Sequence, residues 1–280
     1  MPTATHRLQV EVAPSRREIV AAHLWAAGAV GVLFTADGVT AWFRHAGLDP
    51  EPVGVPRPAE LAAERQRWSL EDDRDWQEEW KATIRPVRAG STVIVPSWLA
   101  DAHVAGDGEL TLVLDPGRAF GSGHHATTTM CLEFIEAIAD DDGLTGRRVA
   151  DVGCGTGVLA IAAAARGATV EAVDVDPVAI EVTAANAARN DVVLHARTGS
   201  VQHLTAPADV VVANLVTDVV IGLAPDLVAA ADHVLVVSGI GVDRADEAIA
   251  ALQRAGGELI ERRERDGWIA ASLRCRPGPA

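Results

Sequence analysis

The chain has 280 residues, which exceeds one average domain and leaves room for a second, smaller one. Hydrophobic residues make up 49% of it, enough for a sizeable core, and 24 Lys and Arg against 39 Asp and Glu give a net charge of −15. This acidic balance argues against a nucleic-acid backbone as the main partner and favours cationic partners.

Targeting, disulfide and metal signals are missing from the sequence. The N-terminus, MPTATHRLQVEVA, lacks the uninterrupted apolar region of a signal peptide, and no charge-free stretch of membrane-spanning length follows. We therefore expect a cytoplasmic protein. Cys131, Cys154 and Cys275 are too few and too scattered for a disulfide framework, and no C-x-x-C pair suggests zinc, so we expect no metal.

The first 45 residues predict a small α+β unit. Residues 8–12 alternate apolar and polar side chains like a half-buried strand, and residues 15–28 have a helical pattern. Residues 30–43 read as a hairpin around Asp37-Gly38. This order of elements suits a ferredoxin-like domain, to which we assign residues 1–70.

Two segments join this unit to the rest of the chain. Residues 46–58 hold four prolines and predict an extended loop. Residues 71–80, EDDRDWQEEW, mix acids with Trp76 and Trp80 at helical i,i+4 spacing. We favour an acidic linker helix with one aromatic stripe packed on a neighbouring domain, and a binding surface is the alternative.

We assign residues 71–90 to this linker helix region and residues 91–280 to a second domain. Strands are expected at 92–95 and 110–114, followed by a glycine-rich loop, DPGRAFGSGHHATTT, over residues 115–129. Its glycines would let the loop fold closely over a ligand, and its threonines could cap the helix that follows. An ordinary loop with a threonine N-cap is the alternative.

The central motif is RVADVGCGTGVLAIA, a short apolar strand and an apolar helix joined by Gly153, Gly155 and Gly157. Three glycines at this sharp turn let a ligand approach the bare main chain and the first helical N–H groups. A dinucleotide turn, G-x-G-x-x-G, competes, but its third glycine would fall on Val158. Asp151 would repel a pyrophosphate and suits a ligand with an ammonium group, such as S-adenosylmethionine.

An acidic residue at the end of the next strand is a second part of this motif. Residues 169–175 predict that strand, and a carboxylate at Asp174 can accept hydrogen bonds from both ribose hydroxyls. Asp176, two residues on, fits a solvated residue or the N-cap of the helix that Pro177 opens. We expect Asp174 to be the ribose ligand.

The remaining pattern predicts an α/β fold, with a parallel sheet and helices on both faces. Strands and helices alternate along residues 148–255, and residues 258–273 then read as a hairpin around Asp266-Gly267. We expect a seven-stranded Rossmann-like methyltransferase sheet with an antiparallel last strand, and the hairpin would place an antiparallel strand at the sheet edge.

Asn214 ends the fourth strand of this sheet, in the sequence VVANLV. Ligands bind at the carboxyl ends of such strands. Its carboxamide oxygen could accept a hydrogen bond from an amine and aim the amine's lone pair at a sulfonium methyl, which would make Asn214 a catalytic residue. A turn-forming Asn after a buried strand is the alternative.

Several motifs resemble the bacterial ribosomal protein L11 methyltransferases over nearly all of residues 68–272. They are DDRDWQEEWKATIRP, VPSW, DPGRAFGSGHHATT, DVGCGTGVLAIAA, AVDVDPVAI followed by NAARN, and VVANL. The resemblance implies S-adenosylmethionine-dependent methylation of lysine side chains and the N-terminal amine of L11. It also implies that the N-terminal unit recognises the substrate through a mobile linker.

The same resemblance implies cofactor contacts at Thr128, Gly153, Asp174 and Asn214. Many amine methyltransferases carry Asn-Pro-Pro-aromatic after the fourth strand, and this chain carries Asn214-Leu215-Val216 instead. That sequence departs from the wider class but is similar to this family.

The expected chemistry is in-line displacement of a methyl group from sulfur by a neutral amine. A free lysine with a pKa of about 10.4 is deprotonated in about one molecule in a few thousand at pH 7, so a dry, orienting pocket matters more than a strong base. His124 and His125 could take up the proton through water, or they could shape the loop.

Two other functions stay open at this point. The chain could methylate lysines of another protein, such as an electron-transfer flavoprotein. It could also be a non-catalytic module that binds an adenosine-containing ligand.

Overall fold

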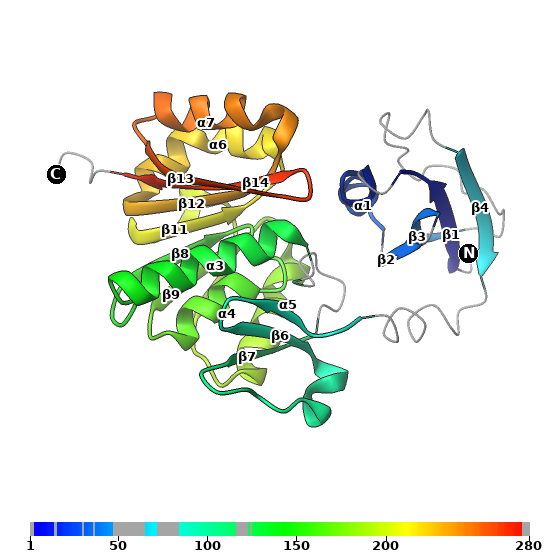
Figure 1. Cartoon of the computed structure of the whole chain (residues 1–280), viewed down its shortest axis with the longest axis horizontal. Coiled ribbons are helices and arrows are strands. Elements are labelled where there is room, and N and C mark those ends of the chain that lie inside the picture. The colour runs from blue at the N-terminus through cyan, green and yellow to red at the C-terminus, as the bar shows by residue number, and fades with distance from the viewer. Residues whose placement is uncertain are drawn as a thin grey trace. The chain divides into compact units, whose positions relative to one another are not determined.

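The computed structural model describes residues 3–13, 16–29, 31–35, 37–46, 65–71, 84–115, 123 and 125–275. The chain divides into two compact units, Met1–Ile84 and Arg85–Ala280 (Figure 1), and each is considered by itself. The expected linker helix with Trp76 and Trp80 lies outside the described residues, as does the expected loop at residues 47–58.

The N-terminal unit is an antiparallel sheet with one described helix. Its strands have the order β2-β3-β1-β4, and they are β1 (Thr3–Glu11), β2 (Gly31–Thr35), β3 (Gly38–Ala46) and β4 (Arg65–Glu71). Helix α1 (Arg17–Ala26) packs Val20 and Leu24 against alternate residues of β1, which explains the sequence pattern at 8–12.

Strand β4 was not expected from the sequence. Its residues, RQRWSLE, are mostly polar, and it pairs with β1 at the edge of the sheet, where polar strands are common. The ferredoxin-like arrangement stays a prediction, because residues 47–64 between β3 and β4 are outside the described residues.

The C-terminal unit contains a seven-stranded sheet with the order β10-β9-β8-β11-β12-β14-β13 (Figure 1). Five strands run parallel, namely β8 (Arg148–Val152), β9 (Thr169–Asp174), β10 (His195–Thr198), β11 (Ala208–Asn214) and β12 (Ala231–Gly241). The expected seven-stranded Rossmann-like sheet is therefore confirmed.

The last strand, β14 (Trp268–Arg274), is antiparallel to β12, as expected. It lies between β12 and β13 (Glu258–Arg265), and β13, which is antiparallel to β14, forms the edge. The reason is composition: all residues of β14 except Arg274 are buried, whereas ELIERRER in β13 is largely exposed. The apolar strand takes the interior place and the charged strand covers the edge.

Helices cover both faces of this sheet (Figure 1). Helices α6 (Thr217–Ala230) and α7 (Ala245–Arg254) lie on one face and share a buried apolar cluster with β11, β12 and β14. Helices α3 (Ala126–Asp141), α4 (Val158–Ala165) and α5 (Pro177–Arg189) lie on the other. None of the helices described is both long and apolar enough to cross a bilayer.

A separate three-stranded sheet precedes α3. It comprises β5 (Val87–Ala89), β6 (Thr92–Pro96) and β7 (Leu110–Leu114), with the 3-10 helix η3 (Ser97–Ala102) between the last two. The strands expected at 92–95 and 110–114 are confirmed, and β5 is too short to have been recognised. Glu136 of α3 accepts hydrogen bonds from the Ser91 N–H on both carboxylate oxygens, at 2.9 and 3.0 Å.

Two asparagines of the NAARN sequence connect α5 to β7. Asn186 is fully buried; its Nδ2 donates to the carbonyls of Asp115 and Thr156 at 3.0 Å each, and its Oδ1 accepts from the Asp115 N–H at 2.9 Å. Asn190, one turn later, makes the same paired contacts with the backbone of Val113 at 2.7 and 2.8 Å. These bonds hold the end of β7, where the glycine-rich loop begins, next to the glycine turn.

We expect Asn186→Ala to destabilise the C-terminal unit by about 3 kcal/mol, because it removes three hydrogen bonds to the backbone of Asp115 and Thr156. Urea unfolding monitored by circular dichroism measures this. Gln202→Ala, at an exposed position, is the control and should change stability by less than about 0.5 kcal/mol. Equal midpoints for the two variants would contradict the anchoring role of Asn186.

Candidate functional site

The glycine turn joins β8 to α4 at the carboxyl edge of the sheet. Gly153, Gly155 and Gly157 all have positive φ, between 53° and 82°. A Cβ atom at Gly153 would lie 2.3 Å from Cδ2 of Leu215, so a side chain here would displace Leu215 as well as strain the backbone at its positive φ. Gly157 is the N-cap of α4 and offers no side chain to the first turn, which leaves backbone N–H groups for a ligand.

Asp151 lies beneath this turn and is 1% exposed. Its Oδ2 accepts a hydrogen bond from the Ala160 N–H at 3.0 Å, and its Oδ1 has no partner among the described residues. Burial raises the pKa of Asp151 to about 7, and the nearby charge of Asp174 acts in the same direction. A buried carboxylate oxygen without a partner suits a ligand ammonium group, as expected for S-adenosylmethionine.

Asp174 ends β9, and its carboxylate is held by the backbone on both sides. Oδ2 accepts from the Gly155 N–H at 2.9 Å, and Oδ1 accepts from the Asp176 N–H at 3.0 Å. Each oxygen retains a lone pair, so the group can still accept hydrogen bonds from a ribose diol. Asp176 is the N-cap of α5, since its Oδ1 accepts from the Val178 N–H at 2.9 Å.

Asn214 ends β11 and contacts the first turn of α3. Its Nδ2 donates to the Oγ1 of Thr128 at 3.3 Å, and Thr128 is 2% exposed. Because this bond engages the amide nitrogen, Oδ1 is left to accept from another group. The structure thus brings the predicted residues into two groups, Thr128 with Asn214 and Asp174 with the glycine turn. Leu215 connects the groups by packing on Gly153.

His125, and not a threonine, is the N-cap of α3, which corrects our expectation. Its Nδ1 accepts from the Thr127 N–H at 3.3 Å, so this ring shapes the start of the helix. The threonines at 127–129 lie inside the helix, which begins at Ala126, so none of them is in the N-cap position. His124 lies outside the described residues, as do residues 116–122 of the loop. Gly123 packs against β6, where a Cβ atom would lie 2.4 Å from Ile94.

Trp268 is a neighbour of the site that the sequence analysis missed. It begins β14, is 7% exposed, and its ring meets the ring of His125 edge-on with centroids 5.0 Å apart. Arg265, just before the turn, donates to the Oγ1 of Thr129 at 3.0 Å and to both oxygens of Glu133 at 2.9 and 3.1 Å. The β13–β14 hairpin is therefore attached to the first turns of α3. The sequence signal that could have pointed to Trp268 is its place directly after the Asp266-Gly267 turn.

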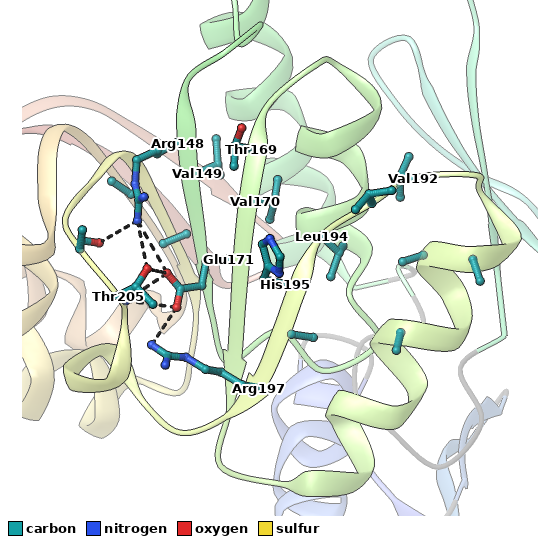
Figure 2. Close-up of a pocket in the computed structure, with 18 residues that line it drawn as sticks. Arg148, Val149, Thr169, Val170, Glu171, Val192, Leu194, His195, Arg197 and Thr205 are labelled. Atoms are coloured by element: carbon teal, nitrogen blue, oxygen red, sulfur yellow. Dashed lines mark hydrogen bonds and ion pairs between the residues drawn. The ribbon is translucent and has the colours of Figure 1, made fainter.

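A large cavity of about 870 Å³ lies elsewhere, around the amino-terminal ends of β8 and β9 and along β10 (Figure 2). Glu171 there accepts from the N–H and Oγ1 of Thr205 at 3.1 and 2.7 Å and pairs with Arg197 at 2.8 Å. None of the predicted site residues lines it. Because ligands of open α/β sheets bind at the carboxyl ends of the strands, we assign the chemistry to the opposite edge.

Comparisons with known proteins identify the family. The family model described as "Ribosomal protein L11 methyltransferase (PrmA)" matches residues 55–276. Proteins named ribosomal protein L11 methyltransferase are similar to this chain. The one from Pelotomaculum thermopropionicum is 40% identical over 229 residues, 79% of this chain and 71% of that protein. The one from Symbiobacterium thermophilum is 38% identical over 211 residues, 74% and 67% of the two chains.

A solved structure is also similar. It is the crystal structure of ribosomal protein L11 methylase from Lactobacillus delbrueckii subsp. bulgaricus, with 27% identity and a TM-score of 0.63. The alignment covers 69% of this chain and 100% of that one.

We expect the affinity for S-adenosylmethionine to fall as the pH drops below about 7. In the free protein the pKa of Asp151 is about 7, so at lower pH the carboxyl must first release a proton to pair with an ammonium group. The dissociation constant should rise up to about tenfold per pH unit. Calorimetry at about pH 6 in buffers of different ionisation enthalpy should also detect proton release.

Asp151→Asn should remove this pH dependence, whereas Asp176→Asn should keep it, because residue 176 only caps α5. A dissociation constant of the parent protein that stays flat between about pH 8 and pH 5.5 would show that Asp151 does not pair with the ligand.

Proposed function

Because the chain belongs to the ribosomal protein L11 methyltransferase family, we propose that it methylates lysine side chains and the N-terminal amine of ribosomal protein L11. S-adenosylmethionine is the methyl donor. The observation that carries the proposal is the hydrogen bond from Nδ2 of Asn214 to Oγ1 of Thr128, which leaves the amide oxygen of Asn214 to accept from an amine. We infer that the protein acts in the cytoplasm, on a ribosomal protein.

The residues suit this cofactor. The N–H groups of the turn around Gly153 would meet its amino-acid end, the orphaned oxygen of Asp151 its ammonium group, and the carboxylate of Asp174 its ribose. Thr128 and Asn214 would face the acceptor, and Leu215, which follows Asn214, packs on Gly153 of the turn. When bound, S-adenosylmethionine supplies a methyl group on a positively charged sulfur.

The role of Asn214 is to orient the acceptor. Its Oδ1 accepts a hydrogen bond from the neutral amine of the substrate, so that the lone pair of the amine nitrogen points away from the carboxamide. Leu215 packs on Gly153 and Trp268 packs on His125, so both would limit the access of water to this edge of the sheet. An amine that enters this partly apolar surrounding has a lowered pKa, because burial disfavours its ammonium form. Orientation and desolvation then act without a dedicated base.

The two units have separate roles in this proposal. All the cofactor residues belong to the unit Arg85–Ala280, which contains the assigned methyltransferase domain 91–280. We assign substrate recognition to residues 1–70. The linker at residues 71–90 connects this recognition domain to the methyltransferase domain. A linker that holds a docked substrate near one pocket raises the effective concentration of each of its amines.

Intact-mass analysis tests the function directly. The purified full chain, S-adenosylmethionine and L11 should yield L11 species heavier by whole methyl groups, and peptide mapping should locate them on lysines and the N-terminus. Binding of the cofactor with no gain in mass on L11 would contradict the proposal. Methylation of a different protein from the same cells would then indicate another target, and no turnover at all would indicate a binding module.

Asn214→Ala should lower the rate of methyl transfer by about 100-fold, because the acceptor amine loses its orienting partner. Single-turnover reactions at saturating cofactor measure this rate. Thr128→Val, which removes the acceptor for the Asn214 amide, should slow the step less, and Thr128→Ser should restore it. An Asn214→Ala protein as fast as its parent would exclude Asn214 from the mechanism.

A fragment that starts at Arg85 should bind S-adenosylmethionine as tightly as the full chain but should fail to methylate intact L11. Partial loss of docking should reduce the yield of multiply methylated L11 before it reduces the yield of singly methylated L11. Only repeated methylation depends on a high effective concentration of the amines near the pocket. Calorimetry and mass spectrometry measure the two properties. Equal rates for fragment and full chain on L11 would disprove the recognition role of residues 1–70.

A further inference from the structure

Three segments at the carboxyl edge of the sheet form a continuous border beside Asn214. The first segment follows β11 (residues 215–219), the second follows β12 (residues 241–244), and the third connects β13 to β14 (residues 266–268). We call these three segments the acceptor rim. The Gly241 N–H donates to the Oγ1 of Thr217 at 3.2 Å, and the Val242 N–H donates to the carbonyl of Gly267 at 3.0 Å. The strand order places this rim beyond β11, on the side away from β9 and Asp174.

Exposed valines are concentrated on the acceptor rim. Val216 is 54% exposed, and Val219 and Val242 are each 39% exposed. Val216 is the N-cap of α6 and Val219 lies in its first turn, so both are at the start of that helix. Eight large hydrophobic side chains are exposed in the described part of the chain, and three of them lie here. This clustering next to Asn214 indicates a contact surface and not random scatter.

The acceptor rim is also negatively charged. Asp218, with 81% of its side chain exposed, and Glu247 both bind Arg244, at 2.6 and 2.8 Å. Asp243 makes no ion pair with any described residue, and its carboxylate folds back over Gly241, where a Cβ atom would lie 2.7 Å from Oδ1. Within the acceptor rim itself the carboxylates are Asp218, Asp243 and Asp266, against the single guanidinium of Arg244. The rim therefore has a net negative charge, which complements a cationic partner.

The chain itself supplies almost no competing amine. Lys81 is the single lysine among 280 residues, against 23 arginines, and no lysine occurs among the described residues. The cation on the rim is Arg244, whose guanidinium keeps its proton and is no acceptor for this chemistry. Apart from Lys81 and the N-terminal amine, an amine that reaches the rim must come from a partner.

We propose that the acceptor rim is the docking surface for the lysine-bearing segment of the protein substrate. Aliphatic side chains flanking the acceptor lysine pack on Val216, Val219 and Val242, and a second cationic group of the segment pairs with Asp243. The inference rests on the proposed function and names what the substrate must carry around its target amine. A second copy of the chain fits less well, since three half-exposed valines present far less than the ~1,200 Å² that stable interfaces bury.

Steady-state methylation of L11 by the full chain tests the proposal. The double variant Val216→Ser/Val242→Ser and the single variant Asp243→Arg should each raise the KM for L11 about tenfold, or about 1.4 kcal/mol, with kcat and the cofactor dissociation constant unchanged. Two variants outside the rim are matched controls, Val193→Ser, at a residue 86% exposed, and Asp141→Arg, at the exposed end of α3. Both should keep the parent KM.

The outcomes separate this proposal from the function on which it rests. A parent protein that leaves L11 unmodified would remove the proposed function. A parent that methylates L11, with the same KM in rim and control variants, would overturn the docking surface alone. A lower molecular mass of the double variant in sedimentation would also overturn it, because the valines would then be an interface between copies. Unchanged urea midpoints establish that the variants are folded.

Discussion

The hydrogen bond from the Gly155 N–H to the carboxylate of Asp174 is the contact on which the rest of the site depends. It ties the turn after β8 to the end of β9, so two neighbouring strands present a preformed edge to the ligand. The same arrangement concentrates negative charge, because Asp151 is buried close to Asp174 and no described cation pairs with either of them. A positively charged ligand would therefore complement this edge.

The carboxyl edge of the sheet has two halves of different chemistry. Above β8 and β9, glycines and carboxylates offer bare backbone and hydrogen-bond acceptors. Above β11, β12 and β14, an amide, an aromatic ring and exposed valines replace them. Leu215 joins the halves, since it follows Asn214 and fills the space that a side chain at Gly153 would need. A polar nucleotide and a desolvated amine need such different surroundings only a few ångströms apart.

Much of this organisation could be predicted from the sequence because its signals are local. The glycine turn, the acid at the end of β9 and the order of parallel strands are encoded by short spacings. Contacts between segments far apart in the sequence were harder to predict. Trp268 and His125 meet because β14 enters the sheet beside β12, and no local pattern specifies that place. The same limit explains why the sequence left open which strand of the hairpin forms the edge, and why strand β4, whose polar residues resemble a loop, was not recognised.

The paired contacts of Asn186 have a consequence for how the protein can be observed. This side chain bonds the backbone of Asp115 on one side and of Thr156 on the other. Local opening that frees one of these partners also frees the other, so the loop start and the cofactor turn open as one unit. Exchange of the Asp115 amide proton with solvent deuterium thus reports on the opening of the glycine turn, although Asp115 lies outside that turn. A ligand that holds Thr156 in place should slow this exchange.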